Sequence, residues 1–330
     1  MRRRDFIKLI AGSIAAWPLA ARAQQPERVR RVGVLMVVAE TDPDAKRLVE
    51  AFETRLDAAG WYKGRNLQIT YRWGANDPEQ LARYANELVL SAPDVLVPFG
   101  TAALVPFRKV TTTIPIVFTA VSDPVAQGFV ASLAHPGGNI TGFSNFEPNI
   151  GSKWLQLLKE IAPSVTQVGV LFNPDTSPYN ALWMDSIEAA APGFGVSAAQ
   201  LSVRADEDIR RVIGALGTKS GSGLIVPSDS FTWERAALIA SLAANSRLPA
   251  VYSYPRFAHE GGLISYGIDL IGQLGQAAAY VGRILKGDRA GELPVQGPTH
   301  YTVSVNLKTA KALGLTIPAA LLATANEVIE

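Results

Sequence analysis

Residues 94–124, DVLVPFGTAALVPFRKVTTTIPIVFTAVSDP, combine two apolar strands, a helix and two polar loops. Val95–Pro98 is an apolar run typical of a buried strand, and small residues follow it directly. Ile114–Ala120 is the next predicted strand, and Ser122 and Asp123 come after it. Ligands of parallel α/β sheets bind beyond the carboxyl ends of the strands. We therefore expect both polar loops to lie at one edge of a parallel sheet.

The same order of elements returns in the second half of the chain. Leu224–Asp229 (LIVPSD) is an apolar run that ends in polar residues. A predicted helix then leads to a Leu-Pro strand at 248–252, which matches the Ile-Pro strand at 114–120. Val32–Met36 and Val168–Phe172 form another similar pair of predicted strands. Any α/β protein repeats a strand, a turn and a helix, but these matches keep the same order, which favours two similar lobes.

Three segments are predicted to cross between the lobes and to form a hinge. Thr141–Asn149 is polar and lacks a helical period, and Gly267–Asp269 and Pro294–Thr299 would cross later. Just before the first crossing, Val125–Leu133 is predicted to form a short helix. Three crossings make a hinge that bends while each lobe stays folded. The first lobe would contain residues 31–143 and about 270–297, and the second residues 146–267 and about 300–330.

Composition limits the class of protein. A chain of 330 residues with 48% hydrophobic residues predicts about two packed domains. The formal charge of +2 falls to −2 once residues 1–23, whose net charge is +4, are removed. A charge so near zero gives no general attraction to nucleic acid. The absence of cysteine excludes disulfides, thiolate metal sites and a cysteine nucleophile.

Residues 1–23 have the pattern of a signal peptide. Arg2–Arg4 form a charged start, Leu9–Ala21 an apolar stretch, and Ala21–Ala23 a small-residue cleavage site. The apolar stretch is too short to span a bilayer, which needs ~20 residues. Arg3–Lys8 is similar to the twin-arginine export motif. We therefore expect cleavage near Ala23 and a mature protein in the periplasm that does not span the membrane.

Polar residues at predicted strand ends are the candidate ligand-binding groups. A buried aspartate can pair with an ammonium group, and the free N–H groups of a helix N-terminus bind carboxylates. Ordinary helix capping is the alternative, because Ser, Thr, Asp and Asn are the preferred N-cap residues. The candidates are Glu40, Thr101, Ser122 and Asp123 in the first lobe, and Asn173, Ser228 and Asp229 in the second.

Aromatic residues near the second set of strand ends could enclose a flat or aliphatic ligand. Core packing explains each of them individually. They are Tyr179, Phe231, Trp233, Tyr252, Tyr254 and Tyr266.

No catalytic, metal or cofactor motif is found. His135, His259 and His300 lie far apart and share no metal-ligand spacing. The chain has neither the G-x-S-x-G pattern of a serine nucleophile nor the G-x-G-x-x-G pattern of a dinucleotide site. The sequence therefore predicts no cofactor and no enzyme.

Seven stretches cover most of the chain after residue 23 and match one known family in its order: 64–73, 111–144, 168–174, 226–229, 247–254, 261–269 and 306–318. Through them the sequence resembles the substrate-binding proteins of ABC transporters, whose best understood members bind tryptophan or phenylalanine. The resemblance implies the type I periplasmic-binding-protein fold: α/β, with two Rossmann-like lobes of parallel sheets joined by a three-strand hinge, and a cleft that closes on the ligand.

The resemblance also implies ligand-binding roles for positions that match the family's pocket. Ser228 stands where the family has threonine, and residues 38–41, the loop after the first strand, do not match the amino-acid binders. The matching positions are Thr101, Asp123, Asn173, Asn180, Asp229 and Ser253.

The favoured hypothesis is a monomeric periplasmic receptor that delivers a small polar molecule, such as an amino acid, to an ABC permease. Asp229 would hold an ammonium or hydroxyl group, Thr101 a carboxylate, and Tyr252 or Trp233 the side chain. A secreted enzyme of the α/β hydrolase type and a sensory module that presents its ligand to a membrane receptor are the alternatives. The absence of a nucleophile motif disfavours the enzyme.

Overall fold

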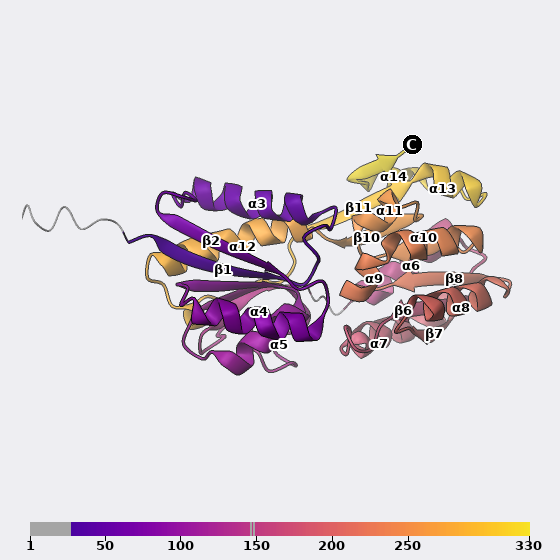
Figure 1. Ribbon diagram of the computed structural model, residues 1–330. Helices are drawn as coiled ribbons and strands as arrows, with labels where there is room; N and C mark the ends of the chain where they lie inside the picture. Colours follow the sequence, from indigo (N-terminus) through magenta and orange to yellow (C-terminus); the bar gives the residue numbers. More distant parts are fainter. Residues whose placement is uncertain (1–27, 146, 148) are drawn as a thin grey trace, which may run out of the picture.

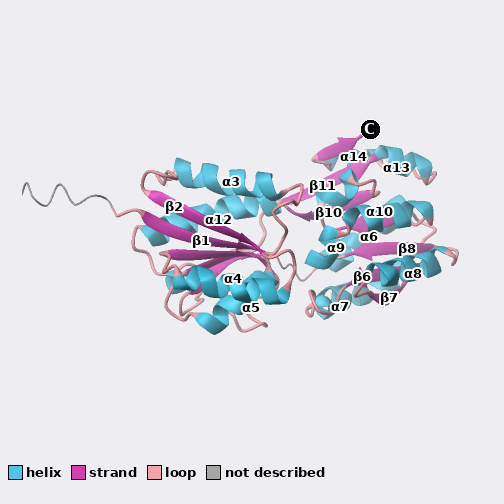
Figure 2. Ribbon diagram, in the orientation of Figure 1, coloured by secondary structure: helices cyan, strands magenta, loops and turns pink. Residues whose placement is uncertain are grey.

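The computed structural model describes residues 28–330 except 146 and 148. The predicted signal peptide, residues 1–23, lies outside the described residues. The chain forms two α/β lobes, each a sheet with helices on both faces (Figures 1 and 2). No helix among the described residues is long and apolar enough to cross a membrane.

The first sheet has five strands in the order β2-β1-β3-β4-β5, and all of its neighbouring strands are parallel. Helices α3 and α12 pack together on one face and α4 and α5 on the other, as Figure 1 shows. The elements are β1 (Arg30–Met36), α3 (Ala45–Ala58), β2 (Leu67–Trp73), α4 (Pro78–Leu90), β3 (Val95–Phe99), α5 (Thr101–Val110), β4 (Ile116–Val121), β5 (Ile140–Ser144) and α12 (Leu270–Leu285).

The second sheet has seven strands in the order β12-β11-β10-β9-β8-β6-β7, and only β10 and β11 pair in antiparallel fashion. Its strands are β6 (Gln167–Phe172), β7 (Ser197–Ser202), β8 (Ser222–Val226), β9 (Ala250–Tyr252), β10 (Ile264–Ile268), β11 (Tyr301–Asn306) and β12 (Glu327–Ile329). Its helices are α6 (Ile150–Ile161), α7 (Asn180–Ala190), α8 (Asp206–Gly217), α9 (Ser230–Glu234), α10 (Ala236–Asn245), α11 (Pro255–His259), α13 (Leu307–Ala312) and α14 (Ala319–Thr324).

Local sequence explains why these elements form where they do. The apolar run of β3 is fully buried, as expected for a central parallel strand covered on both faces. The side chain of Asp77 accepts hydrogen bonds from the backbone N–H groups of Glu79 and Gln80 and so caps α4. Gln273 of α12 donates to the carbonyl of Ser144 and accepts from the N–H of Ala120, which anchors this late helix in the first lobe.

The chain passes between the two sheets three times: between β5 and α6, between β10 and α12, and before β11. The prediction that Thr141–Asn149 is a crossing segment is wrong in its first part, because Ile140–Ser144 is a buried edge strand. Its polar residues are tolerated because they have partners. For example, the Thr141 hydroxyl donates to the carbonyl of Leu293 at 2.5 Å.

The predicted helix at Val125–Leu133 is also wrong, because this segment forms turns and bends. The Asp123 carboxylate accepts from the N–H of Ala126, and the Gln127 side chain donates to the carbonyl of Ser122. The Asp123 contact is of the N-cap type and begins a turn, but the turn does not continue into a helix. Gly128 then adopts φ +67°, in the left-handed region.

Candidate functional site

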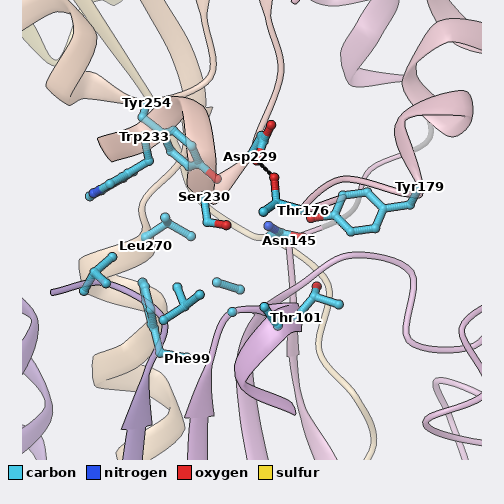
Figure 3. Close-up of a pocket in the computed structure, with 15 residues that line it drawn as sticks. Phe99, Thr101, Asn145, Thr176, Tyr179, Asp229, Ser230, Trp233, Tyr254 and Leu270 are labelled. Carbon is cyan, nitrogen blue, oxygen red and sulfur yellow. Dashed lines mark hydrogen bonds between the residues drawn. The ribbon is translucent and has the colours of Figure 1, made fainter. Parts of the chain in front are cut away.

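A cavity of about 460 Å³, including solvent at its mouth, lies where the carboxyl ends of the two sheets face each other. Figure 3 shows its walls, with the first lobe below and the second above. Polar residues from both lobes meet in it, together with an apolar wall from the first lobe and three aromatic rings from the second.

The first-lobe wall is built where β3 passes into α5. Gly100 makes this turn with φ +94°, and a Cβ atom there would lie 2.9 Å from Cγ1 of Val37. A side chain at this position is therefore disfavoured by both conformation and space. Thr101 and Ala102 follow as the first residues of α5 and line the cavity. The first N–H groups of a helix have no intrahelical partner, so they can bind an anionic group.

A short chain of hydrogen bonds supports this wall. The N–H of Ser122 donates to Oγ1 of Thr101 at 3.3 Å, and its hydroxyl donates to Oδ1 of Asn145 at 2.8 Å. Ser122 is completely buried, and Asn145, which lies in the first crossing between lobes, lines the cavity. Asn145 of the first crossing thus helps to hold Ser122, and through it Thr101, in place.

Asp229 is the charged group of the second-lobe wall, and it is only 1% exposed. Its carboxylate accepts from the N–H of Asn173 at 2.7 Å and the N–H of Phe231 at 2.9 Å. It also accepts from the hydroxyl of Thr176 at 2.5 Å, the bond drawn in Figure 3. Burial raises the pKa of Asp229 from 3.8 to about 6, and the three donors limit this rise. In the absence of ligand, the carboxyl group therefore titrates near neutral pH.

Three aromatic side chains complete the second-lobe wall. The rings of Trp233 and Tyr254 meet edge to face, with centroids 4.7 Å apart. Tyr179 lies at the opposite flank of the cavity in Figure 3. Burial raises the pKa of Tyr179 to about 12, and hydrogen bonding to Ser122 and Thr101 of the first lobe acts in the opposite direction. Tyr179 thus reaches across the cleft as a neutral hydroxyl group.

The structure brings some of the predicted residues together. Thr101 and Asp229 line the cavity directly. Ser122 and Asn173 lie behind the lining and hold it by hydrogen bonds. Ser228 is buried next to Asp229 but is not part of the lining.

The structure places the other five predicted residues away from the lining. Glu40 is exposed, and Asp123 uses its carboxylate within its own turn. Tyr252 is 1% exposed and stacks on Phe257 in the core at 4.6 Å between centroids. The remaining two, Asn180 and Ser253, are buried, and their side-chain polar atoms have no partner among the described residues.

The sequence reasoning did not select three of the polar lining residues, Asn145, Thr176 and Ser230. Thr176 lies three residues after Asn173 in the same strand-end loop, so the strand-end argument could have found it. Tyr179, Trp233 and Tyr254 were among the aromatic candidates, and all three line the cavity. The apolar lining residues, such as Phe99 and Leu270, carry no signal that separates them from core residues.

The described residues contain no group of three or more His, Cys, Asp or Glu side chains that could hold a metal ion. The groups that this site offers to a ligand are hydrogen-bonding groups and aromatic rings.

Two α/β lobes, three crossings and a cavity between the lobes are the architecture of the periplasmic binding proteins. The chain belongs to the ABC transporter substrate binding protein family, whose family model matches residues 31–329. Members of this family bind a small molecule for an ABC transporter. They act as binding proteins, outside the cytoplasm, and not as enzymes.

Individual relatives agree with this assignment. A tyrosine-binding protein of Clostridioides difficile (strain R20291) is 26% identical over 291 residues, which is 88% of this chain and 82% of that protein. A Streptococcus pneumoniae domain solved in complex with L-Trp superposes with a TM-score of 0.83 at 24% identity, covering 91% of this chain and 99% of that one. A substrate-binding protein with adhesive properties from Clostridium difficile has been solved in a ligand-free, open form. It superposes with a TM-score of 0.70 at 25% identity, covering 91% of this chain and 99% of that one.

Proposed function

We propose that this chain is the receptor of an importer and that its ligand is a single amino acid with an apolar or aromatic side chain. The observation that carries the proposal is the polarity of the cavity. A buried carboxylate lies on one lobe, a helix N-terminus lies opposite it on the other, and aromatic rings lie beside both. These groups match the ammonium, the carboxylate and the side chain of a zwitterionic amino acid.

Asp229 is the proposed partner of the ammonium group. It is buried, and an ammonium group that binds beside it would lower its raised pKa and restore full ionisation. Its three donors come from its own lobe and hold the carboxylate in place before a ligand arrives. A charge-assisted hydrogen bond in such a site is about twice as strong as a neutral one.

Thr101 and the first turn of α5 are the proposed partners of the carboxylate. The helix dipole and the free N–H groups favour negative charge at this point. Gly100 lets the backbone approach the ligand closely, because it places no side chain in the turn. Among the residues that the structure describes, no positively charged side chain lines this cavity, and the helix N-terminus is the electropositive feature of its lining.

The side chain of the ligand would lie between Trp233 and Tyr254 above and Phe99 and Leu270 below. Edge-to-face and stacked contacts with aromatic rings stabilise a bound ring by about 0.5–1.5 kcal/mol beyond its buried area. The tyrosine-binding relative supports a ligand of this chemical class.

We also propose export to the periplasm with cleavage near Ala23, delivery to an ABC permease, and a monomeric state. Residues 1–23 support export through their charge and hydropathy pattern. The proposed first lobe contains residues 31–143 and about 270–297, and the proposed second lobe residues 146–267 and about 300–330.

Thermal unfolding of residues 24–330 with a panel of compounds tests the function. The panel contains sugars, nucleosides and the L-amino acids. For each aromatic amino acid it also contains the D-enantiomer, the amine without its carboxylate and the acid without its ammonium group. A ligand at 100 times its Kd adds about 2.7 kcal/mol to the free energy of unfolding. We expect a shift with apolar or aromatic L-amino acids and little with either truncated analogue.

Two variants locate the site. Asp229→Asn should abolish the shift, whereas Asp175→Asn should keep it, because Asp175 lies in the adjacent loop and pairs with Arg204 at the surface. Shifts produced only by sugars or nucleosides would refute the amino-acid assignment.

A further inference from the structure

Asp42 of the first lobe makes two short contacts with the second lobe. Its Oδ2 accepts a hydrogen bond from Nε1 of Trp233 at 3.0 Å and from Nη1 of Arg256 at 2.6 Å. Asp42 lies in the loop between β1 and α3, whereas its partners lie in α9 and α11. The side chains of Asp42 and Arg256 are only 4% and 13% exposed, so this ion pair is largely removed from water.

Trp233, one of the two partners of Asp42, also forms part of the wall of the ligand cavity. The Trp233 ring lines the cavity and meets Tyr254 edge to face. The guanidinium of Arg256 lies 5.6 Å from the centre of the same indole ring, on which a cation is favoured. Asp42 therefore fixes the orientation of Trp233 through its N–H group and through Arg256.

These contacts require the two lobes to be closed. Near them, Nδ2 of Asn76 in the first lobe donates to the carbonyl of Ser230 in the second at 3.3 Å. The buried apolar residues of the first lobe also form one continuous cluster with those on one face of the second. A relative has been solved open and without ligand, so lobes of this kind separate. Separation would expose Asp42 and Arg256 to water and free the indole.

We propose that Asp42 is a positioning residue that, when the lobes close, locks Trp233 against the bound ligand and slows ligand release. The inference rests on the proposed function, because it assigns this residue to the same ligand cavity. A buried ion pair is favourable only when both partners are present, so the pair forms and breaks as a unit. Contacts made only in the closed state act on the dissociation rate and not on the association rate.

Stopped-flow kinetics with L-tyrosine as the probe test the proposal on residues 24–330. In Asp42→Ala, the dissociation rate should rise about 10-fold or more, while the association rate stays within about 2-fold. Trp233→Phe keeps a ring in the wall but loses the N–H donor, and should show a smaller rise of the same kind. Asp44→Asn is the matched control, because Asp44 lies in the same loop and pairs with Arg47 of its own lobe.

Closure itself can be measured without a ligand. The chain contains no cysteine, so spin labels can be attached to Ala82→Cys in α4 and Arg210→Cys in α8, two exposed positions on different lobes. Pulsed dipolar spectroscopy then reports the closed fraction. Asp42→Ala should lower this fraction in the ligand-free protein and with L-tyrosine, and Asp44→Asn should leave it unchanged.

Identical distance distributions for the wild type and Asp42→Ala in both conditions would overturn the proposal. A rise in the L-tyrosine dissociation rate that is the same in Asp42→Ala and Asp44→Asn would also overturn it. If no compound of the panel binds the wild type, the proposed function fails instead. The comparison of ligand-free distance distributions then decides alone, since it does not depend on binding.

Discussion

Amino-acid binding should weaken as the pH falls through about 6, because Asp229 must be ionised to hold an ammonium group. Burial raises the pKa of this carboxyl group from 3.8 to about 6 in the ligand-free protein. The ammonium and carboxylate groups of the ligand do not titrate between pH 5 and 8. At pH 5 about one tenth of the protein would carry the ionised carboxylate, so Kd should rise about 10-fold relative to pH 7.5.

The same group makes the stability of the ligand-free protein depend on pH. Because the folded-state pKa lies above the unfolded one, the stabilising contribution is fully present below pH 3.8 and is lost as the pH rises through 6. The difference between 3.8 and about 6 corresponds to about 3 kcal/mol, since each pH unit is worth about 1.4 kcal/mol. Asp229 is 1% exposed, so solvent screening does not reduce this contribution appreciably.

Isothermal titration calorimetry from pH 5 to 8 measures Kd, and urea unfolding over pH 3.5 to 8 measures stability. The wild type should lose affinity as the pH falls below 6, and should lose this part of its stability as the pH rises from about 4 to 6. Asp229→Asn should bind weakly at every pH and lack this component of the stability profile. A Kd that stays constant from pH 5 to 8, or a pH profile that is unchanged in Asp229→Asn, would refute the reasoning. Asp175→Asn, an exposed change in the neighbouring loop, should behave like the wild type.

Three further outcomes are expected. Trp154→Phe removes a fully buried indole and its 2.7 Å hydrogen bond to a backbone carbonyl, so urea unfolding should show a loss of about 2–3 kcal/mol. Gly100→Ala should cost about 1–2 kcal/mol in the same assay and weaken ligand binding in calorimetry, whereas Gly137→Ala, also at positive φ but with open space around it, should affect stability alone. Replacing Arg3 and Arg4 by lysine should retain the precursor in the cytoplasm, as cell fractionation can show; export at the normal level would contradict the twin-arginine motif.

The polar half of the cavity could be predicted because strand ends have a fixed place in a parallel sheet. Thr101 and Asp229 each follow a buried apolar strand, and carboxyl ends of neighbouring parallel strands meet at one edge. Asn145 could not be placed in this way, because it is positioned by the first crossing between lobes. Such a position depends on how two separate lobes face each other, which no local pattern contains.

The aromatic residues of the cavity show a second limit of prediction from sequence: strand periodicity assigns a face only to residues within the strand. Tyr252 is the last residue of β9, and its ring packs into the core against Phe257. Tyr254, only two residues later, precedes α11 and lines the cavity. Strand periodicity would put both rings on one face. The chain leaves the strand between them, so the periodicity does not extend to Tyr254.

The division of charges between the lobes explains why closure would select a zwitterion. Asp229 belongs to the second lobe, while Thr101 and the N-terminus of α5 belong to the first. An amine without a carboxylate could bind only the second lobe, and an acid without an ammonium group only the first. Neither would favour the closed state strongly, because a ligand shifts an equilibrium only by its difference in affinity for the two states. An amino acid would bind both lobes, so its full binding free energy would become available only when they close and Asp42 reaches Trp233.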